Sequence, residues 1–243
     1  MDTNPRRKEL IPMIKEWLSS FLLLLLFISE TFLVTAQPSD KISRIHFLPF
    51  FGEEKLILHQ KFALNHRDSI ELNTFRFYVS DIFGLEKKEK LIYHLVDISD
   101  TASLKFQMKI PDKEVRLNFF LGIDSATNEM GIGEGDLDPT RGMYWTWQSG
   151  YINVKLEGTL IDSIGNKTNF TFHLGGFRSP YLASQFIPLN IPTPAISQDV
   201  KIKIELKDFF QIVDARMTNK IMSPSMQAVE ISKKLAGLFS LME

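Results

Sequence analysis

Five histidines are the side chains of this sequence best suited to hold a metal ion, because its 243 residues include no cysteine. They are His46, His59, His66, His94 and His173. Neutral imidazole suits both Cu(I) and Cu(II), and a chain without thiols has little else to offer copper. His66 lies in the turn "NHRD" and is expected to be exposed. His94 in "YHLVD" and His173 in "FHLGG" lie in expected strands, where the alternative to a ligand is a buried ring bonded to a backbone carbonyl.

Thioether sulfur is the other soft donor in the chain. Met222 and Met226 are four residues apart, which places them one turn apart if this segment is helical. Methionine commonly fills gaps in apolar cores, so packing is the expected role of both.

The aromatic stretch "GMYWTWQSGY", residues 142–151, contains Trp145 and Trp147, two of the three tryptophans in the chain. If a strand begins near Tyr144, alternation places Trp145, Trp147, Ser149 and Tyr151 on one face and Tyr144 on the other. Two tryptophans on one face could form a core layer, a stacking platform for a sugar, or a site of redox chemistry at the indole. The pattern leaves these three alternatives open.

A long surface loop is expected between Ser125 and Met143, because this segment is rich in glycine and acidic residues. Its Glu134, Asp136 and Asp138 alternate as carboxylates do in calcium loops, but the remaining ligands of an EF-hand are missing. We therefore expect a solvated turn in which the Asp138 side chain caps nearby backbone amides. Long loops in small domains are often functional.

Local catalytic motifs are missing from the sequence. It has no Gly-x-Ser-x-Gly elbow, no P-loop, no dinucleotide fingerprint and no His-Glu-x-x-His. The chain is therefore expected not to be an enzyme. Its formal net charge of -1 gives no support for nucleic acid or an anionic membrane as a partner.

The fold class predicted is all-β, an antiparallel β-sandwich with a C-terminal helix. Alternation of apolar and polar residues marks strands over 55–64, 69–82, 90–98, 115–124, 150–161, 169–176 and 200–206. Strands this frequent, without helices between them, favour a sandwich over alternating β/α units. Near the end, Ser223 as N-cap and Pro224 at the first helical position predict one helix that covers a sheet edge or one end of the sandwich.

Residues 1–36 predict a cleavable signal peptide. Basic residues precede the apolar core "WLSSFLLLLLFIS", which is too short to span a bilayer comfortably, and "VTAQ" offers a cleavage site after Ala36. Glu30 followed by "TFLVTA" leaves an uncleaved anchor as the alternative, and in either case the rest of the chain is exported. Residues 37–243 then form one domain, which must be stabilised by packing because it has no disulfides.

The segment "LDPTRGMYWTWQSGYINVKLEG", followed by "FTFHLGG", resembles the MbnP-like family of exported bacterial copper-binding proteins. "FRFYVSDI", "YHLVD", "FFLGID" and the closing "IMSPSMQAVEISKKLAGLF" are similar to other parts of that family, so the resemblance covers nearly all of the mature chain. It implies a periplasmic copper-binding β-sandwich that is not an enzyme. It also implies a tryptophan oxidised to kynurenine by a partner dihaem cytochrome of the MauG-like peroxidase class, with the product beside histidines at the copper site.

Carried onto this sequence, the resemblance implies that Trp145 or Trp147 is the modified residue. It implies His173 as the first metal ligand, because this residue lies in the matching F-H-L-G motif, followed by His94 and then His46. His46 lies near the mature N-terminus in "RIHFLPFFG". The alternative to copper is an exported binding module that recognises carbohydrate or protein through the Trp145 and Trp147 face.

Overall fold

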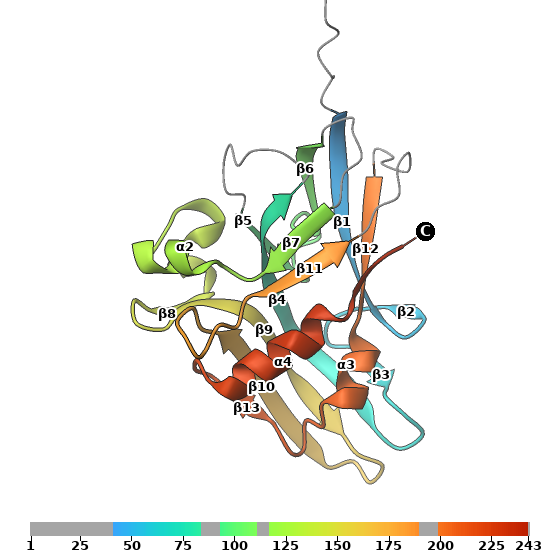
Figure 1. Cartoon of the computed structure of the whole chain (residues 1–243). Helices are drawn as coiled ribbons and strands as arrows, with labels where there is room; N and C mark the ends of the chain where they lie inside the picture. Colours follow the sequence, from blue (N-terminus) through green and yellow to red (C-terminus); the bar gives the residue numbers. More distant parts are fainter. Residues whose placement is uncertain (1–40, 84–92, 111–116, 190–198, 243) are drawn as a thin grey trace, which may run out of the picture. The chain divides into compact units, whose positions relative to one another are not determined.

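β-Strands are the main secondary structure in the part of the chain that the structure describes, as the alternation of apolar and polar residues predicts (Figure 1). The computed structural model describes residues 41–83, 93–110, 117–189 and 199–242. The predicted signal peptide, residues 1–36, lies outside this part of the chain. Among the described residues, no helix has both the length and the apolar character needed to cross a membrane.

The larger sheet contains His173 and the aromatic stretch. Its hydrogen-bonded order is β11-β7-β4-β9-β10-β13, while β3 and β5 pair with β4, and β8 pairs with β9. These strands are β3 (Lys61–Ala63), β4 (Ser69–Phe83), β5 (Tyr93–Asp97), β7 (Leu117–Leu121), β8 (Tyr144–Thr146), β9 (Gly150–Ile161), β10 (Lys167–Gly175), β11 (Gln185–Leu189) and β13 (Lys220–Ile221).

The smaller sheet has the order β14-β12-β1-β2, and β6 pairs with β1. Its strands are β1 (Lys41–Phe51), β2 (Glu54–Lys55), β6 (Lys105–Ile110), β12 (Asp199–Glu205) and β14 (Phe239–Leu241). Most strand pairs in both sheets are antiparallel, but β1 pairs with β12 and β10 pairs with β13 in parallel. The predicted β-sandwich is therefore confirmed, with two parallel pairs that local alternation could not reveal.

One predicted strand is wrong in its extent. Residues 55–64 hold only the end of β2 and the three residues of β3, with a turn between them. His59 adopts φ +65° in this turn, a left-handed conformation outside the region of regular β-strands. The other predicted strands that the structure describes, β4, β5, β7, β9, β10 and β12, lie where alternation placed them.

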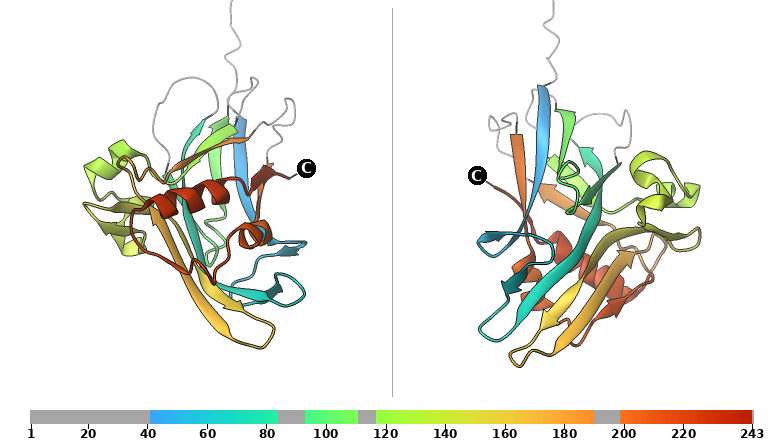
Figure 2. Two further views of the ribbon diagram at one scale, coloured as in Figure 1. Left: turned by 60° about the horizontal axis from the view of Figure 1, so that its bottom comes forward. Right: turned by 180° about the vertical axis from the view of Figure 1, so that it is seen from behind.

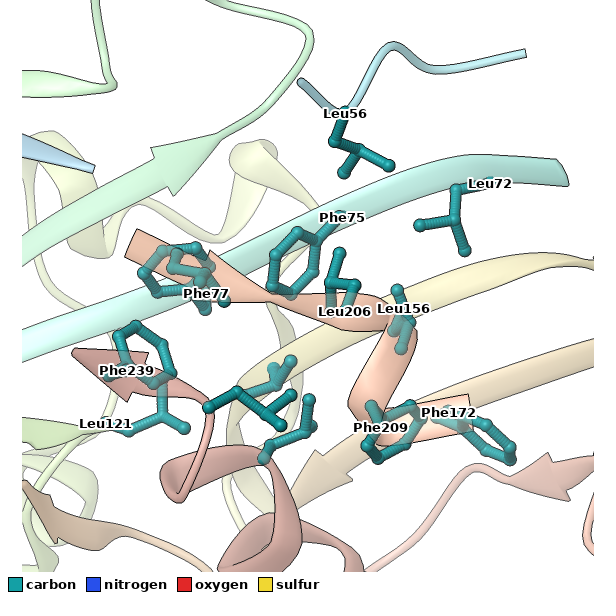
Figure 3. Close-up of a cluster of buried hydrophobic side chains, with 14 of the residues drawn as sticks. Leu56, Leu72, Phe75, Phe77, Leu121, Leu156, Phe172, Leu206, Phe209 and Phe239 are labelled. Carbon is teal, nitrogen blue, oxygen red and sulfur yellow. The ribbon is translucent and has the colours of Figure 1, made fainter. Parts of the chain in front are cut away.

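The main apolar core lies between the two sheets, and Figure 3 shows part of it. Phe77 of β4 is fully buried there. Its ring centroid lies 5.5 Å from that of Phe47, 5.2 Å from Phe75 and 5.7 Å from Phe239. Phe47 comes from β1 and Phe239 from β14, so this aromatic group joins the two sheets.

Two helices near the C-terminus complete the core. The helix α3 (Leu206–Ile212) was not predicted, although Leu206, Phe209 and Phe210 have helical spacing and all point into the core. The predicted C-terminal helix is α4 (Met226–Ala236), which packs on β10 and β11 (Figure 1).

The predicted N-cap of this helix is wrong by two residues. Ser225, not Ser223, accepts a hydrogen bond on Oγ from the backbone N–H of Ala228, at 3.1 Å. Pro224 consequently precedes the cap and does not occupy the first helical turn. The first turn of α4 therefore begins at Met226.

The Phe77 contacts predict the cost of opening the core. We expect Phe77→Ala to lower the free energy of unfolding by about 3 to 5 kcal/mol, because it leaves a cavity between the sheets. Ile57→Ala is a suitable control, since Ile57 is 58% exposed. Urea titration followed by tryptophan fluorescence measures both variants, and equal losses would contradict the assignment of Phe77 to the core.

Candidate metal site on the outer face of the larger sheet

A second, smaller apolar cluster lies on the outer face of the larger sheet. Its buried members are Tyr78, Leu95, Ile123, Met143, Tyr151 and Ile152. Tyr78 lies between Phe77 and Val79, which both point into the main core, so its ring must point to the opposite face. Residues 122–149 cover this cluster. The larger sheet is therefore buried on both faces at this end.

The covering segment, residues 122–149, is called the cover loop here. It contains the short helix α2 (Ser125–Met130), two 3-10 turns, η1 (Gly135–Leu137) and η2 (Pro139–Arg141), and β8. Figure 2 shows α2 and β8 together beside one end of the larger sheet. The prediction that residues 125–143 lack strands is confirmed, but the segment is not simply a surface loop, because it contains α2 and buries Thr127, Asn128 and Met143.

Asp136 fastens the cover loop to the sheet and is not part of a solvated turn, so the sequence prediction is wrong at this residue. Its Oδ2 accepts a hydrogen bond from the backbone N–H of Leu95 at 3.0 Å and lies 3.2 Å from His94 Nδ1. The hydrogen bond from His94 is the main reason why the pKa of Asp136 falls below its ordinary value. The Tyr78 hydroxyl also donates to the Asp136 carbonyl, at 2.8 Å.

Asp138 behaves as the sequence predicts. Its Oδ1 accepts hydrogen bonds from the backbone N–H and the hydroxyl of Thr140, at 2.8 and 2.7 Å. These bonds cap η2. The three alternating carboxylates of this segment therefore have different structural contacts and do not face a common point as calcium ligands would.

Alternation predicts that the two tryptophans share one face of a strand, and this prediction is wrong. β8 ends at Thr146, and residues 147–149 form the turn that leads into β9. Trp147 lies in this turn and is 70% exposed. Trp145 is half-buried and packs against the smaller cluster. A two-ring platform is therefore not formed.

The ring of Trp145 lies against β10. A Cβ atom added at Gly175 would come within 2.7 Å of Trp145 Cζ3 and 2.5 Å of the Tyr151 carbonyl oxygen, so only glycine leaves room for this contact. Gly175 follows His173 by two residues, with a β-bulge at Leu174 and Gly175. The indole thus lies near the end of the strand that carries His173.

A row of charged side chains crosses the outer face at the border of the cover loop. The strand registers pair Asp97 with Arg76, Arg76 with Lys155, and Lys155 with His173. Arg76 Nε lies 2.8 Å from Asp97 Oδ2. Two of these residues also hold the cover loop, because Arg76 Nη1 donates to the carbonyl of residue 141 at 3.2 Å and Lys155 Nζ donates to that of residue 142 at 3.3 Å.

His173 ends this row and is fixed by Glu157. The His173 Nε2 atom lies 2.6 Å from Glu157 Oε1, and the Thr74 hydroxyl donates to Glu157 Oε2 at 2.9 Å. Burial has the largest single effect on Glu157 and raises its pKa, but the hydrogen bonds from His173 and Thr74 outweigh it and the pKa falls. An ionised Glu157 is an acceptor only, so His173 Nε2 carries the proton.

The other nitrogen of His173, Nδ1, has no hydrogen-bond partner among the described residues. A neutral ring with its proton on Nε2 presents a lone pair at Nδ1. A carboxylate that accepts from one ring nitrogen while the other binds metal is the usual arrangement around metal-ligating histidines. Sequence analysis missed Glu157, although alternation along β9 already placed it on the outer face.

His94 lies elsewhere and has both ring nitrogens occupied. Nε2 lies 2.6 Å from the Ser103 carbonyl oxygen, and Nδ1 lies 3.2 Å from Asp136. Its ring packs against Phe106, with centroids 4.8 Å apart. These contacts match the alternative expectation, a ring bonded to a backbone carbonyl.

His46 lies on the smaller sheet. Its neighbours Ile45 and Phe47 point into the main core, so His46 points away from it. Burial, assisted by nearby cations such as Lys105, lowers the pKa of His46, against the opposing attraction of Asp199. The outer faces of two different sheets thus carry His46 and His173, with the core between them.

The structure therefore does not bring the three predicted ligand histidines together. No group of three or more histidine and carboxylate side chains within the described ranges is arranged to hold a metal ion. What it does place near one another are His173 with its carboxylate partner Glu157, and the ring of Trp145, which lies against Gly175 two residues farther along β10. We call these three residues the His173 site.

These features define an all-β sandwich with one oriented histidine and a tryptophan on the outer face of its larger sheet. The family model for MbnP matches residues 40–225, so the chain belongs to the MbnP family. MbnP from Methylosinus trichosporium is similar in fold, with a TM-score of 0.50 and 15% sequence identity over 79% of this chain and 87% of that chain. No curated protein sequence matches.

Asp136 gives a prediction for the cover loop. We expect Asp136→Ala to destabilise the protein by about 1 to 3 kcal/mol and to speed hydrogen exchange at the Leu95 amide, because that buried donor loses its acceptor. Glu134→Ala is the matched control, since Glu134 is exposed and its side chain makes no capping bond. Equal exchange at Leu95 in the two variants would show that Asp136 does not anchor the loop.

Proposed function

We propose that this chain is an exported copper-binding protein whose metal is held at His173 Nδ1. The observation that carries the proposal is the short contact between His173 Nε2 and Glu157, which leaves Nδ1 as the atom free for a metal. Membership of the MbnP family supports copper as the metal. Neutral imidazole is a suitable copper ligand, and Glu157 would raise its basicity and fix its orientation.

Trp145 is the tryptophan that we propose to lie at the copper. Its ring lies against Gly175, two residues from His173, whereas Trp147 points into solvent. An intact indole N–H is a donor only and is a poor ligand. Conversion to kynurenine would expose an aniline nitrogen and a carbonyl oxygen, and both can face a metal.

A partner dihaem cytochrome of the MauG-like peroxidase class would carry out this conversion. Two molecules of hydrogen peroxide would each deliver one oxygen atom to the C2–C3 bond of the indole and leave as water. The bond breaks and N-formylkynurenine forms. Hydrolysis then releases formate and leaves kynurenine. Hydrogen peroxide supplies the oxidising equivalents and the haems of the partner would activate it, so this chain is the substrate of the reaction and not an enzyme.

The place of action that we propose is the periplasm. The apolar run in residues 17–29, the basic residues before it and the small residues around position 36 support export. The lack of cysteine also suits an oxidising compartment, since no thiol can be oxidised there.

Recognition of carbohydrate or protein is the second candidate function. The exposed Trp147 is the observation in its favour, because a ring that is 70% exposed can stack on a ligand. The half-buried Trp145 counts against a two-ring platform. Binding of this kind would survive the loss of His173.

Removal of the His173 imidazole separates these two functions. We expect His173→Ala to weaken Cu(I) binding by more than the roughly 10- to 100-fold that loss of an outer-shell partner causes. His46→Ala should bind as the wild type does, because His46 lies on the other sheet. Competition with a chromophoric Cu(I) chelator under anaerobic conditions measures both. Unchanged affinity in His173→Ala would refute the proposed ligand.

The proposed oxidation of Trp145 can be tested directly. Protein isolated from its native periplasm should carry the mass increase of kynurenine over tryptophan, and peptide mapping should place it at residue 145. Trp145→Phe should abolish the modification, whereas Trp147→Phe should retain it. An unmodified peptide in the wild type, or modification that persists in Trp145→Phe, would overturn the assignment.

A further inference from the structure

We propose that the thioether sulfur of Met222 is a second protein ligand beside His173 Nδ1, which makes the site selective for a soft monovalent ion such as Cu(I). The inference rests on the proposed function and adds a donor to it. It reverses the sequence expectation that Met222 serves only for packing.

The strand register places Met222 next to His173. β13 runs parallel to β10, and Ile221 is the register partner of Phe172. β13 ends at Ile221, and continuing its register by one residue places Met222 opposite His173.

A second contact fixes the chain on the far side of Met222. A Cβ atom added at Gly176 would lie 3.2 Å from Pro224 Cβ, so Pro224 lies beside the end of β10. The chain therefore follows β10 on both sides of Met222 and does not turn away from it after β13.

Met222 and His173 also point to the same face. Ile221 is buried in the main core, and so is Phe172. Alternation, continued one residue past the end of β13, directs the residue after each one to the outer face. Met222 is 46% exposed, so an incoming ion can reach part of this residue.

The orientation of the imidazole directs its lone pair to the same side. Glu157 lies on β9, one neighbour of β10, and it holds His173 Nε2. The two ring nitrogens of an imidazole point in widely divergent directions. Nδ1 therefore faces away from β9, and the strand on that other side of β10 is β13.

An imidazole nitrogen and a thioether form a donor pair with a clear preference. Thioether sulfur favours Cu(I), whereas the hard cations Ca²⁺ and Mg²⁺ require oxygen ligands. Low coordination number also suits Cu(I), so two protein donors with one further group from residue 145 would suffice. The acidic residues of the cover loop are not needed.

Met222→Leu tests the sulfur itself, because leucine keeps the apolar volume and removes the donor. Met226→Leu is the matched control, since Met226 is 50% exposed on α4. We expect Met222→Leu to weaken Cu(I) binding about tenfold or more, and Met226→Leu to change it by less than about twofold. Copper X-ray absorption should show a sulfur scatterer in the wild type that is missing in Met222→Leu.

The outcomes separate the two proposals. If His173→Ala loses Cu(I) but Met222→Leu binds as the wild type does and no sulfur scatterer is seen, the thioether ligand is refuted and the copper site stands. If His173→Ala keeps its affinity, the proposed function fails as stated. Circular dichroism of each variant shows whether the fold is retained, and a sulfur scatterer that persists in Met222→Leu also refutes the inference.

Discussion

The structure depends on one constraint, the need to bury the larger sheet on both faces at one end. The inner face of β4, β9 and β10 carries an unbroken apolar surface that packs against the smaller sheet. At one end the outer face is apolar as well, with Tyr78 and Tyr151 among its buried side chains. Exposed apolar surface costs about 25 cal/mol per Å². The cover loop removes this surface from water, and its path follows from that requirement.

The His173 site lies where this cover ends. Inside the border, the side chains of the apolar cluster are buried beneath the loop, while outside it outer-face side chains such as Glu157 are partly exposed. Arg76 and Lys155, which lie on the border, donate to carbonyl oxygens of the loop and so hold its edge. Hydrogen bonds in such half-buried surroundings are electrostatically stronger than in water. This setting favours a well-defined His173 ring held by Glu157.

Much of the fold could be predicted from the sequence, because alternation is a local signal. β9 lies at the predicted residues 150–161, and no end of β4, β10 or β12 differs from its predicted position by more than two residues. The motif resemblance also predicted the correct family, although the chain shares only 15% identity with MbnP from Methylosinus trichosporium. The parallel neighbours of β1 and β10 could not be predicted, since pairing partners distant in sequence leave no local pattern.

Less of the candidate site could be predicted, for the same reason. Alternation predicts Trp145 and Trp147 on one face because the turn at residues 147–149 contains no glycine or proline that would mark it in the sequence before Gly150. Placing His46 and His173 on different sheets requires the topology, which spacing does not contain. Glu157 can be recognised as the partner of His173 only from the pairing register of β9 and β10. Asp136 has a charge typical of solvated turns, yet it binds the free edge of β5.

Gly175 shows that the site also restricts which residues can occupy positions that bind no metal. An added methyl group there would collide with both the Trp145 ring and the Tyr151 carbonyl oxygen. The Tyr151 oxygen belongs to the backbone of β9 and cannot move aside alone, and the Trp145 ring packs on the apolar cluster. A residue that contributes no atom to metal binding can therefore be as restricted in its substitutions as a ligand. Because Gly175 has no side chain, the Trp145 indole can lie against β10, the strand that carries His173.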